Sequence, residues 1–245
     1  MIEDYKKING IDITNIMKFV GINKENIVRM FKAGAGVPGP APAGIFGIED
    51  DVALQLFNGA QYANGELVLS RSSSQYGTLS DNNAYDRLTG ETMTISGKFY
   101  MNSQPAKSNQ TIISKMTGAN AWDGYVLAVV DSGGDKFRYY LAINGSNSNN
   151  STNISTTINV SQWYSYSIVI RSNKNISLWL DNSNIDNRTV NEIPGNTSVP
   201  LILGAIYTNP GYTNHFDGLI KDIKIHKREL TSQEINNLHN GIDVV

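Results

Sequence analysis

From about Asp51 onward, the chain is a succession of short apolar or alternating runs separated by turn residues. In order, the runs read VALQLF, ELVLSR, TMTISGKFYM, QTIISK, GYVLAVV, FRYYLAI, WYSYSIVIR, ISLWLD, PLILGA and LIKDIKIH. The breaks between them have turn chemistry, as in DSGGD at 131–135, NGSNSNN at 144–150 and DNSN at 181–184. Because no long helical pattern lies between the runs, they predict an all-β fold, an antiparallel β-sandwich or jelly roll.

Alternation along two of these runs predicts which side chains face the core, because successive side chains of a strand point to opposite faces. In the first, Met93, Ile95, Gly97 and Phe99 share one face. In the last, Leu219, Ile223 and Ile225 are expected to line one face, after a tight turn at Asp217-Gly218. Both runs are therefore expected to contribute to the core of the sandwich.

One helix is signalled, near the end of the chain. Thr231 and Glu234 have the spacing of a capping box, with Thr231 at the N-cap. Leu230 and Ile235 occupy the positions of a hydrophobic staple, and Gly241 is a suitable stop. The pattern predicts a short helix that packs on the sandwich.

The residues before the sandwich form two further segments. Residues 1–33 contain two similar units, GIDITNIMKFV and GINKENIVRMF, each too short to bury its apolar side alone. Residues 34–50 begin with GAGVPG, which has the Gly-x-Gly-x-x-Gly spacing of a dinucleotide-binding loop. The prolines that follow prevent the helix such a loop requires, so this stretch is interpreted as a Gly/Pro-rich linker. The predicted domains are an anchor at 1–33, a linker at 34–50 and a jelly roll at 51–245.

Composition excludes several classes of function. The formal net charge is -2 and basic residues form no cluster, which gives no reason to expect nucleic acid as a partner. The chain has no cysteine, so disulfides and cysteine-ligated metals are excluded. No window is apolar enough for membrane insertion. The opening MIEDYKKING has no apolar signal region, and we expect synthesis in a host cytoplasm without a signal peptide.

The later runs resemble a known family. WYSYSIVIRSNKNISLWLDN resembles its characteristic hairpin, and LILGA followed by FDGLIKDIKIHKRELTSQEINNLHNG resembles its closing segment. The family is the laminin-G-like, pentraxin-like jelly roll of the concanavalin A-like lectin and glucanase superfamily, and the resemblance covers residues 52–241. It implies a lectin-like sandwich whose relatives bind or hydrolyse glycans.

The N-terminal KINGIDITNIMKFVGI is similar to short repeats that open many bacteriophage virion proteins. The two resemblances together imply a non-enzymatic virion protein, in a capsid decoration, head fibre or tail. Residues 1–33 would contact other virion proteins, and the jelly roll would bind cell-surface or environmental glycan, with many copies multiplying a weak affinity. A homo-oligomer is expected. A purely structural decoration or adaptor without sugar binding, and a glycan hydrolase, are the alternatives.

Catalytic patterns are not found in the sequence. EDDVAL supplies Glu49 and Asp51, but Leu54 stands where the Glu-x-Asp-x-x-Glu pattern of laminarinase-type relatives needs its second glutamate. The chain has three histidines and no His-Glu-x-x-His or Gly-x-Ser-x-Gly motif. Of these histidines, His226 and His239 are interpreted as surface residues. The prediction is therefore a protein without enzymatic activity.

Two loops combine aromatic rings with amides, the side chains that contact sugar faces and hydroxyls. The predicted carbohydrate-binding residues are Asn120, Trp122, Asp123, Tyr207, Asn209, Tyr212, Asn214 and His215. The alternative is that these rings only cover the edge of the sandwich.

Calcium is the one cofactor that the resemblance suggests, because many relatives hold Ca²⁺ with Asp, Asn and carbonyl oxygens at a rim. The candidate ligands are Asp81, Asn83, Asp123 and Asp217, with Asn82 beside them. In the last strand, however, Lys221 occupies a position where the family often carries an acid. The alternative is that these Asp and Asn side chains cap turns.

Overall fold

The computed structural model describes most of the chain after residue 53 and four residues before it. The described residues are 7–8, 11–12, 54–86, 90–105, 109–117, 123–131, 135–142, 151–190, 193, 196–208 and 211–244. The chain divides into two compact units, Met1–Pro40 and Ala41–Val245. In the first unit, β1 (Lys7–Ile8) and β2 (Ile11–Asp12) form an antiparallel pair in which Ile8 lies opposite Ile11.

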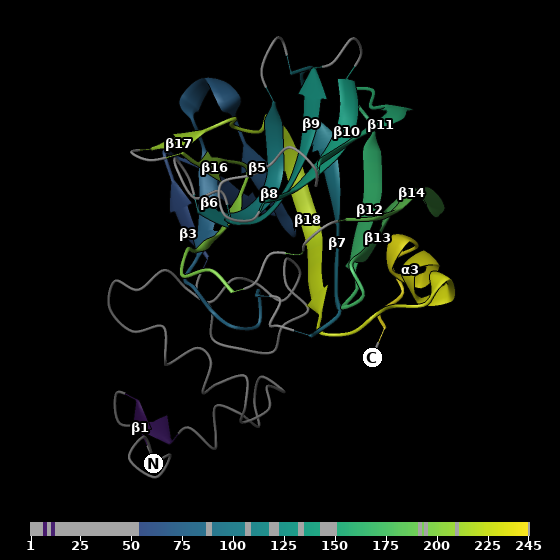
Figure 1. Ribbon diagram of the computed structural model, residues 1–245. Helices are drawn as coiled ribbons and strands as arrows, with labels where there is room; N and C mark the ends of the chain where they lie inside the picture. Colours follow the sequence, from purple (N-terminus) through teal and green to yellow (C-terminus); the bar gives the residue numbers. More distant parts are fainter. Residues whose placement is uncertain are drawn as a thin grey trace. The chain divides into compact units, whose positions relative to one another are not determined.

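The second unit is an antiparallel sandwich of two seven-stranded sheets, as the sequence predicts (Figure 1). Sheet I has the order β11-β10-β9-β8-β15-β6-β3. Its strands are β3 (Gln55–Phe57), β6 (Tyr76–Leu79), β8 (Gln110–Thr117), β9 (Asp123–Asp131), β10 (Asp135–Ala142), β11 (Ser151–Thr157) and β15 (Leu201–Leu203).

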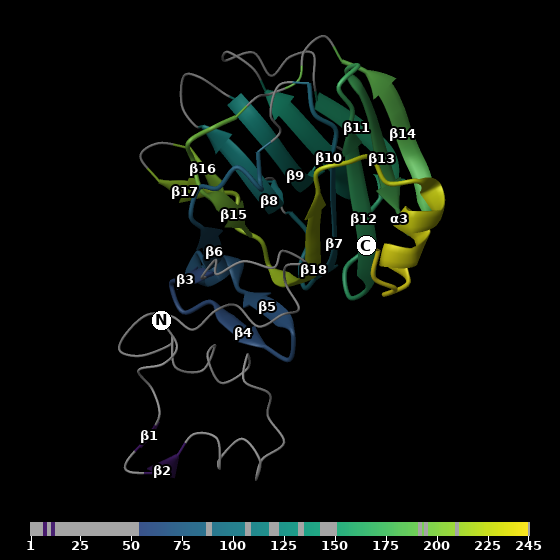
Figure 2. The same ribbon diagram turned by 90° about the horizontal axis from the view of Figure 1, so that it is seen from below.

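Sheet II has the order β14-β13-β12-β7-β18-β5-β4 and lies against sheet I (Figure 2). Its strands are β4 (Gln61–Ala63), β5 (Glu66–Leu69), β7 (Met93–Met101), β12 (Trp163–Ile170), β13 (Asn175–Leu180), β14 (Ser183–Thr189) and β18 (Gly218–His226). A single turn of 3₁₀ helix, η1 (Arg71–Ser73), lies between β5 and β6.

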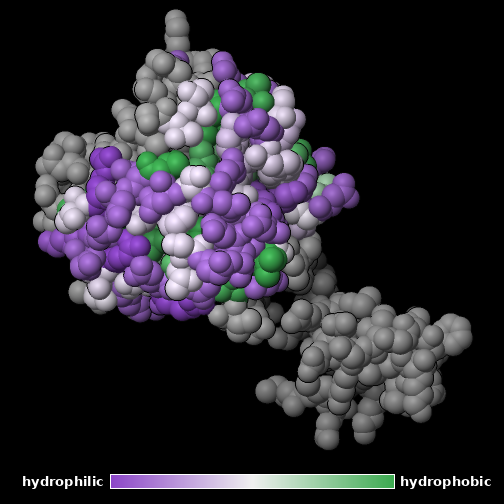
Figure 3. Space-filling model, turned by 90° about the vertical axis from the view of Figure 1, so that its right-hand side faces the viewer, coloured by the Kyte–Doolittle hydropathy of each residue, from purple (hydrophilic) through white to green (hydrophobic). Residues whose placement is uncertain are grey.

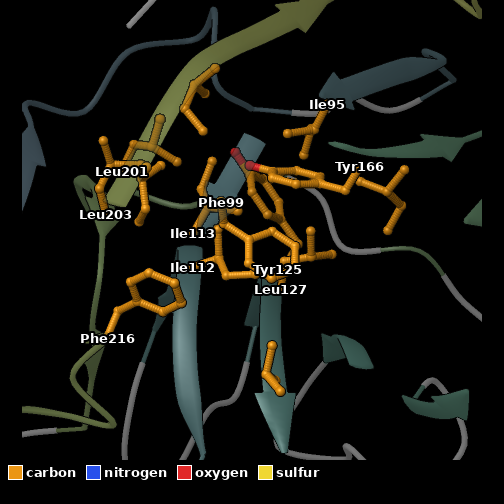
Figure 4. Close-up of a cluster of buried hydrophobic side chains, with 14 of the residues drawn as sticks. Ile95, Phe99, Ile112, Ile113, Tyr125, Leu127, Tyr166, Leu201, Leu203 and Phe216 are labelled. Atoms are coloured by element: carbon orange, nitrogen blue, oxygen red, sulfur yellow. The ribbon is translucent and has the colours of Figure 1, made fainter. Parts of the chain in front are cut away.

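The core lies between the sheets and is built from the alternate residues that face inward (Figure 4). Met93, Ile95 and Phe99 of β7 are fully buried, which confirms the face predicted for this run. Gly97 completes that face because a Cβ there would lie 2.7 Å from both the Tyr166 hydroxyl and Ile223 Cδ1. The glycine in this apolar run is therefore required by the close packing of Tyr166.

The last strand, β18, corrects one prediction. Its pairing with β7 shifts register between Lys221 and Lys224, and Asp222 at the shift has a φ of 54°. Such a β-bulge adds a residue and changes which side chains face inward. Ile220 and Ile223 are consequently fully buried in the core, whereas Leu219, predicted to share a face with Ile223, is only partly buried.

The helix α3 (Ser232–His239) forms as predicted on the outer face of sheet II (Figure 1). The Glu234 amide donates to Thr231 Oγ1 at 3.2 Å and the Thr231 amide donates to Glu234 Oε2 at 2.8 Å, which completes the capping box. Leu230 and Ile235, at the staple positions, are both buried. They pack with Val169 of β12, which points away from the core.

The sheet edges are polar or short. β11 and β14 lie at one edge of their sheets and read STNISTT and SNIDNRT, while β3 and β4 at the opposite edges have three residues each. On β14, Arg188 pairs with Asp186 at 2.8 Å. In the part of the chain that the structure describes, no helix has the length and apolar character of a membrane span.

Candidate functional site

A short hairpin covers part of the outer face of sheet I. The chain leaves β15 at Gly204, whose φ is +80° and where a Cβ would lie 2.2 Å from Leu69 Cδ1, so only glycine fits this turn. β16 (Ile206–Tyr207) and β17 (Tyr212–Thr213) then pair, with Tyr207 opposite Tyr212. The hairpin is fixed to the sheet because Ser114 Oγ donates to the Ala205 carbonyl at 2.8 Å.

Four aromatic rings gather where this hairpin meets β3 and β6. The rings of Phe57 and Tyr76 are stacked with centroids 4.7 Å apart, and Tyr76 stacks on Tyr212 at 4.2 Å. Tyr207 meets Tyr212 edge-on at 5.5 Å. Tyr76 is buried with 8% of its surface exposed, and the other three are partly exposed. We call these four residues the aromatic surface.

The strand register explains why these rings meet. Phe57 lies directly opposite Tyr76 in the β3–β6 pair, and both point away from the core because strand alternation places them on the face opposite Leu79, which packs in it. Ile202 of β15 and Ala205 lie under the rings and are fully buried. The hairpin therefore adds a second layer of aromatic side chains to a sheet face that is apolar here.

His215 and Asn214 follow the hairpin. The ring of His215 lies 5.9 Å from that of Tyr76, and its Nε2 is 3.1 Å from the Tyr212 carbonyl. Burial lowers the pKa of His215, so its ring is neutral at pH 7 and the Nε2–H donates to that carbonyl. Asn214 has a φ of 55°, and its carbonyl accepts from the Thr111 amide at 2.9 Å. Burial also raises the pKa values of Tyr76 and Tyr212, which keeps both phenols neutral.

The structure thus brings together four of the predicted carbohydrate-contacting residues: Tyr207, Tyr212, Asn214 and His215. Asn120, Trp122 and Asn209 lie outside the described residues, and Asp123 begins β9 opposite Thr117. Sequence reasoning missed Phe57 and Tyr76. The signal that the sequence offered was an aromatic residue at the end of each of two strands. It could not be used because β6, with the sequence YGTL, was not predicted as a strand.

The candidate calcium ligands do not meet at one place. Asp81 Oδ1 lies 2.6 Å from Lys115 Nζ near the end of β8, and Asn83 Oδ1 accepts from Asn196. Asp217 Oδ2 instead accepts from Ser103 Oγ, and the Asp217 amide donates to Gln110 at the start of β8. Residues 110 and 115 of an extended strand are about 17 Å apart. Among the described residues, no three His, Asp or Glu side chains are grouped so that they could hold a metal ion.

His239 corrects a second prediction, because it is buried rather than a surface residue. Its Nδ1 accepts from the Asn182 amide at 3.1 Å, and its Nε2 lies 2.9 Å from Ser167 Oγ. Burial lowers the pKa of His239 to about 4. It therefore fixes the end of α3 to sheet II. The cavity beside it is about 80 Å³, well below the size of ordinary ligand pockets, and is lined partly by Lys98 and Asp222.

Two carboxylates meet the same cation at one end of the sandwich. Asp81 and Asp86 lie 2.6 and 3.2 Å from Lys115 Nζ, and Asp86 is 2% exposed. A glycosidase needs one carboxylic acid and one carboxylate that both reach the substrate. Both carboxylates of this pair contact an ammonium group, and one of them, Asp86, is buried. The pair therefore lacks the arrangement that a glycosidase needs. The aromatic surface can instead stack against flat apolar faces of a ligand while its phenol groups form hydrogen bonds.

A comparison with protein families identifies one match. The profile described as the concanavalin A-like lectin/glucanases superfamily, a laminin-G-type profile, matches residues 71–236, which include β6, β7, β18 and most of α3. Among curated proteins, none matches the chain.

Solved structures share the fold at low identity. The binding domain of botulinum neurotoxin serotype D is 16% identical with a TM-score of 0.59, covering 78% of this chain and 47% of that one. The serotype D ligand binding domain in complex with N-acetylneuraminic acid is 14% identical with a TM-score of 0.60, covering 78% and 46%. A Ruminococcus gnavus IT-sialidase CBM40 bound to α2,3-sialyllactose is 17% identical with a TM-score of 0.53, covering 61% and 83%. This chain spans about half the length of the toxin domains, and identities this low show a shared fold alone.

Proposed function

Because the chain belongs to the concanavalin A-like lectin/glucanases superfamily, we propose that it binds carbohydrate through the aromatic surface. The supporting observation is the stack of four rings, Phe57, Tyr76, Tyr212 and Tyr207, of which three are partly exposed. Aromatic faces stack on the apolar faces of sugar rings, and tyrosine hydroxyls bond sugar hydroxyls. The CBM40 neighbour, which is solved with α2,3-sialyllactose, supports a sialylated glycan as the first ligand to test.

The proposed activity is binding without catalysis. The neighbours reported above are binding domains or a carbohydrate-binding module. The two carboxylates that meet at Lys115 do not form a catalytic pair, because Asp86 is buried. A release assay on polysaccharide tests this part, and liberated reducing ends at a rate proportional to protein concentration would contradict it.

The test of sugar binding is a glycan array that includes α2,3-sialyllactose, followed by calorimetry on the best ligand. Tyr212→Ala removes the central exposed ring, and we expect affinity to fall at least tenfold, about 1.4 kcal/mol. Tyr212→Phe keeps the stacking ring and should retain most of the affinity.

Tyr100→Ala is the matched control. Tyr100 is also a partly exposed tyrosine that contacts another ring, Trp163, at 5.7 Å, but it belongs to sheet II. Its removal should leave sugar affinity unchanged. Equal losses for Tyr212→Ala and Tyr100→Ala would contradict the assignment to the aromatic surface. An array with no binder, with and without Ca²⁺, would favour a purely structural decoration.

We further propose that the sandwich is displayed on a bacteriophage particle, with residues 1–33 as the part that docks on other virion proteins. The support is the repeated N-terminal unit and the Gly/Pro-rich stretch that follows it in the sequence. Particles assembled with a chain lacking residues 1–33 should contain none of it, whereas full-length protein should be incorporated. Incorporation of the shortened chain at normal copy number would disprove this docking role.

A further inference from the structure

Lys115 of β8 is a buried lysine whose ammonium group is surrounded by oxygen atoms. Its Nζ lies 2.6 Å from Asp81 Oδ1 and 3.2 Å from Asp86 Oδ1. It also donates to the carbonyl oxygens of Thr197 and Val199, at 3.0 and 2.7 Å. The lysine side chain is 1% exposed. Four oxygens from two separate segments therefore converge on one cation.

This set of oxygens has the composition of a calcium site. Ca²⁺ binds carboxylate and backbone carbonyl oxygens at 2.3–2.6 Å, with water completing six to eight ligands. The distances from the ammonium to these oxygens run from 2.6 to 3.2 Å, as expected for hydrogen bonds from nitrogen. Asp86 Oδ2 and Thr197 Oγ1 are buried without a hydrogen-bond partner among the described residues, so two further oxygens are at hand.

The charges fit the same interpretation. Asp81 and Asp86 carry two negative charges when ionised, and the ammonium supplies one positive charge among them. Without Lys115, the two negative charges of the carboxylates would balance the two positive charges of a divalent ion. Asp86 is 2% exposed, and a buried carboxylate left without a cation is strongly destabilising. Asp81 is 41% exposed, which leaves a side from which water and ions reach the site.

The cation connects parts of the chain that are distant in sequence. Asp81 and Asp86 follow β6, Thr197 and Val199 precede β15, and Lys115 lies near the end of β8. The Thr197 amide additionally donates to Asp86 Oδ1 at 3.2 Å. A cation at this point therefore holds both connections against sheet I, which is the task that a structural metal ion performs at a loop rim.

We propose that the ammonium group of Lys115 permanently occupies a cation site built from calcium-type ligands. This end of the sandwich consequently closes without a metal ion, and it becomes a divalent-cation site when the lysine is removed. Asp81, one of the candidate calcium ligands, pairs with the lysine instead. Calcium does not fit beside Lys115 because the ammonium fills the position that the ion would take.

The test is Lys115→Ser in the full chain, compared with the unchanged protein in 1 mM CaCl₂ and in EDTA. Thermal unfolding of the unchanged protein should be the same in both solutions. The variant should unfold at lower temperature in EDTA, and Ca²⁺ should raise its midpoint by about 5–10 °C at saturation. Calorimetry should show one Ca²⁺ bound to each variant chain. Adding Asp86→Asn to the variant should abolish both effects.

Lys98→Ser is the matched control, because Lys98 is also a strand lysine paired with an aspartate, Asp222, at 3.3 Å but is partly exposed. It should show no response to Ca²⁺. If Lys115→Ser does not fold in EDTA, its refolding yield with and without Ca²⁺ becomes the readout, and rescue by Ca²⁺ supports the proposal. Absence of any Ca²⁺ effect on stability or refolding of Lys115→Ser would overturn it. So would stabilisation of the unchanged protein by Ca²⁺ that Asp86→Asn removes.

Discussion

The two sheets of the sandwich are covered on their outer faces in different ways. On sheet II, α3 closes over Val169 with Leu230, Ile235 and Leu238, all of them buried. Around this side the described surface is mostly hydrophilic, with hydrophobic residues only in small separate patches (Figure 3). On sheet I, the β16–β17 hairpin covers Ile202 and Ala205 but leaves Tyr207 and Tyr212 partly exposed.

The two covers differ in what they leave exposed. The α3 cover is structural, whereas the hairpin cover leaves a surface suited to a ligand. The α3 cover removes Leu230, Ile235 and Leu238 from water, and hydrogen bonds of His239 fix the end of the helix. The hairpin cover buries its small apolar residues and presents its large rings. When a ligand covers an exposed aromatic ring, apolar surface is removed from water, which favours binding. A side chain that is already buried has no such surface left to contribute.

The largest effect should come from the α3 cover. Ile235→Ala removes a side chain that is 1% exposed, and it should lower the free energy of unfolding by about 3 kcal/mol. Chemical denaturation measures the loss. Sugar affinity, measured on the folded variant, should be unchanged because Ile235 packs on the opposite sheet. A variant that lost its affinity while still folded would mean that the two covers are coupled.

An intermediate effect should follow from pH, again through α3. His239 has its pKa lowered to about 4 in the folded protein, against an ordinary value of 6.5. Folding therefore disfavours the protonated form of His239. The contribution of this group to the free energy of unfolding is fully present above pH 6.5 and declines as the pH falls towards 4. Below pH 4 this group causes no further decline. A protonated Nδ1 can no longer accept the hydrogen bond from the Asn182 amide. The difference between the two pKa values corresponds to at most about 3 kcal/mol. Screening by nearby water reduces the expected loss to about 2 kcal/mol.

The control for this prediction is His239→Gln, which cannot titrate. Its unfolding free energy should be lower at pH 7 but should change less between pH 7 and pH 4 than that of the unchanged protein. His215 and His226, whose pKa values burial also lowers, remain in both proteins and cancel in the difference. Parallel pH profiles for the two proteins would contradict the role assigned to His239.

The smallest effect on stability should come from the hairpin. Tyr207 is partly exposed and meets Tyr212 edge-on, so Tyr207→Ala should cost about 1 kcal/mol of unfolding free energy or less. The same substitution should weaken sugar binding severalfold in calorimetry. A stability loss as large as that of Ile235→Ala would erase the distinction between the two covers.

Local patterns predicted much of the fold. All ten runs identified in the sequence form strands, and α3 has the predicted capping box. The missed strands include β11 and β14, because an edge strand with little apolar surface to bury carries no alternating pattern. The bulge at Asp222 was also missed, since its residue type does not require a positive φ.

The candidate site was only half predictable for a related reason. Tyr207 and Tyr212 lie in one loop and could be grouped from sequence spacing. The stacking of Tyr212 on Tyr76 depends on the pairing of β6 with β15, a contact between segments more than one hundred residues apart. The role of Asp81 was likewise hidden, because its partner Lys115 lies on a different strand. Long-range pairing, rather than local chemistry, decided both outcomes.

The polar and short edge strands would matter if the sandwich is displayed in many copies, as proposed above. An exposed strand edge is a template on which another chain can add a strand. Here β14 carries an Asp186–Arg188 ion pair, and β3 and β4 have only three residues each for a neighbour to join. At high local concentration, neighbouring sandwiches should therefore not join their sheets edge to edge.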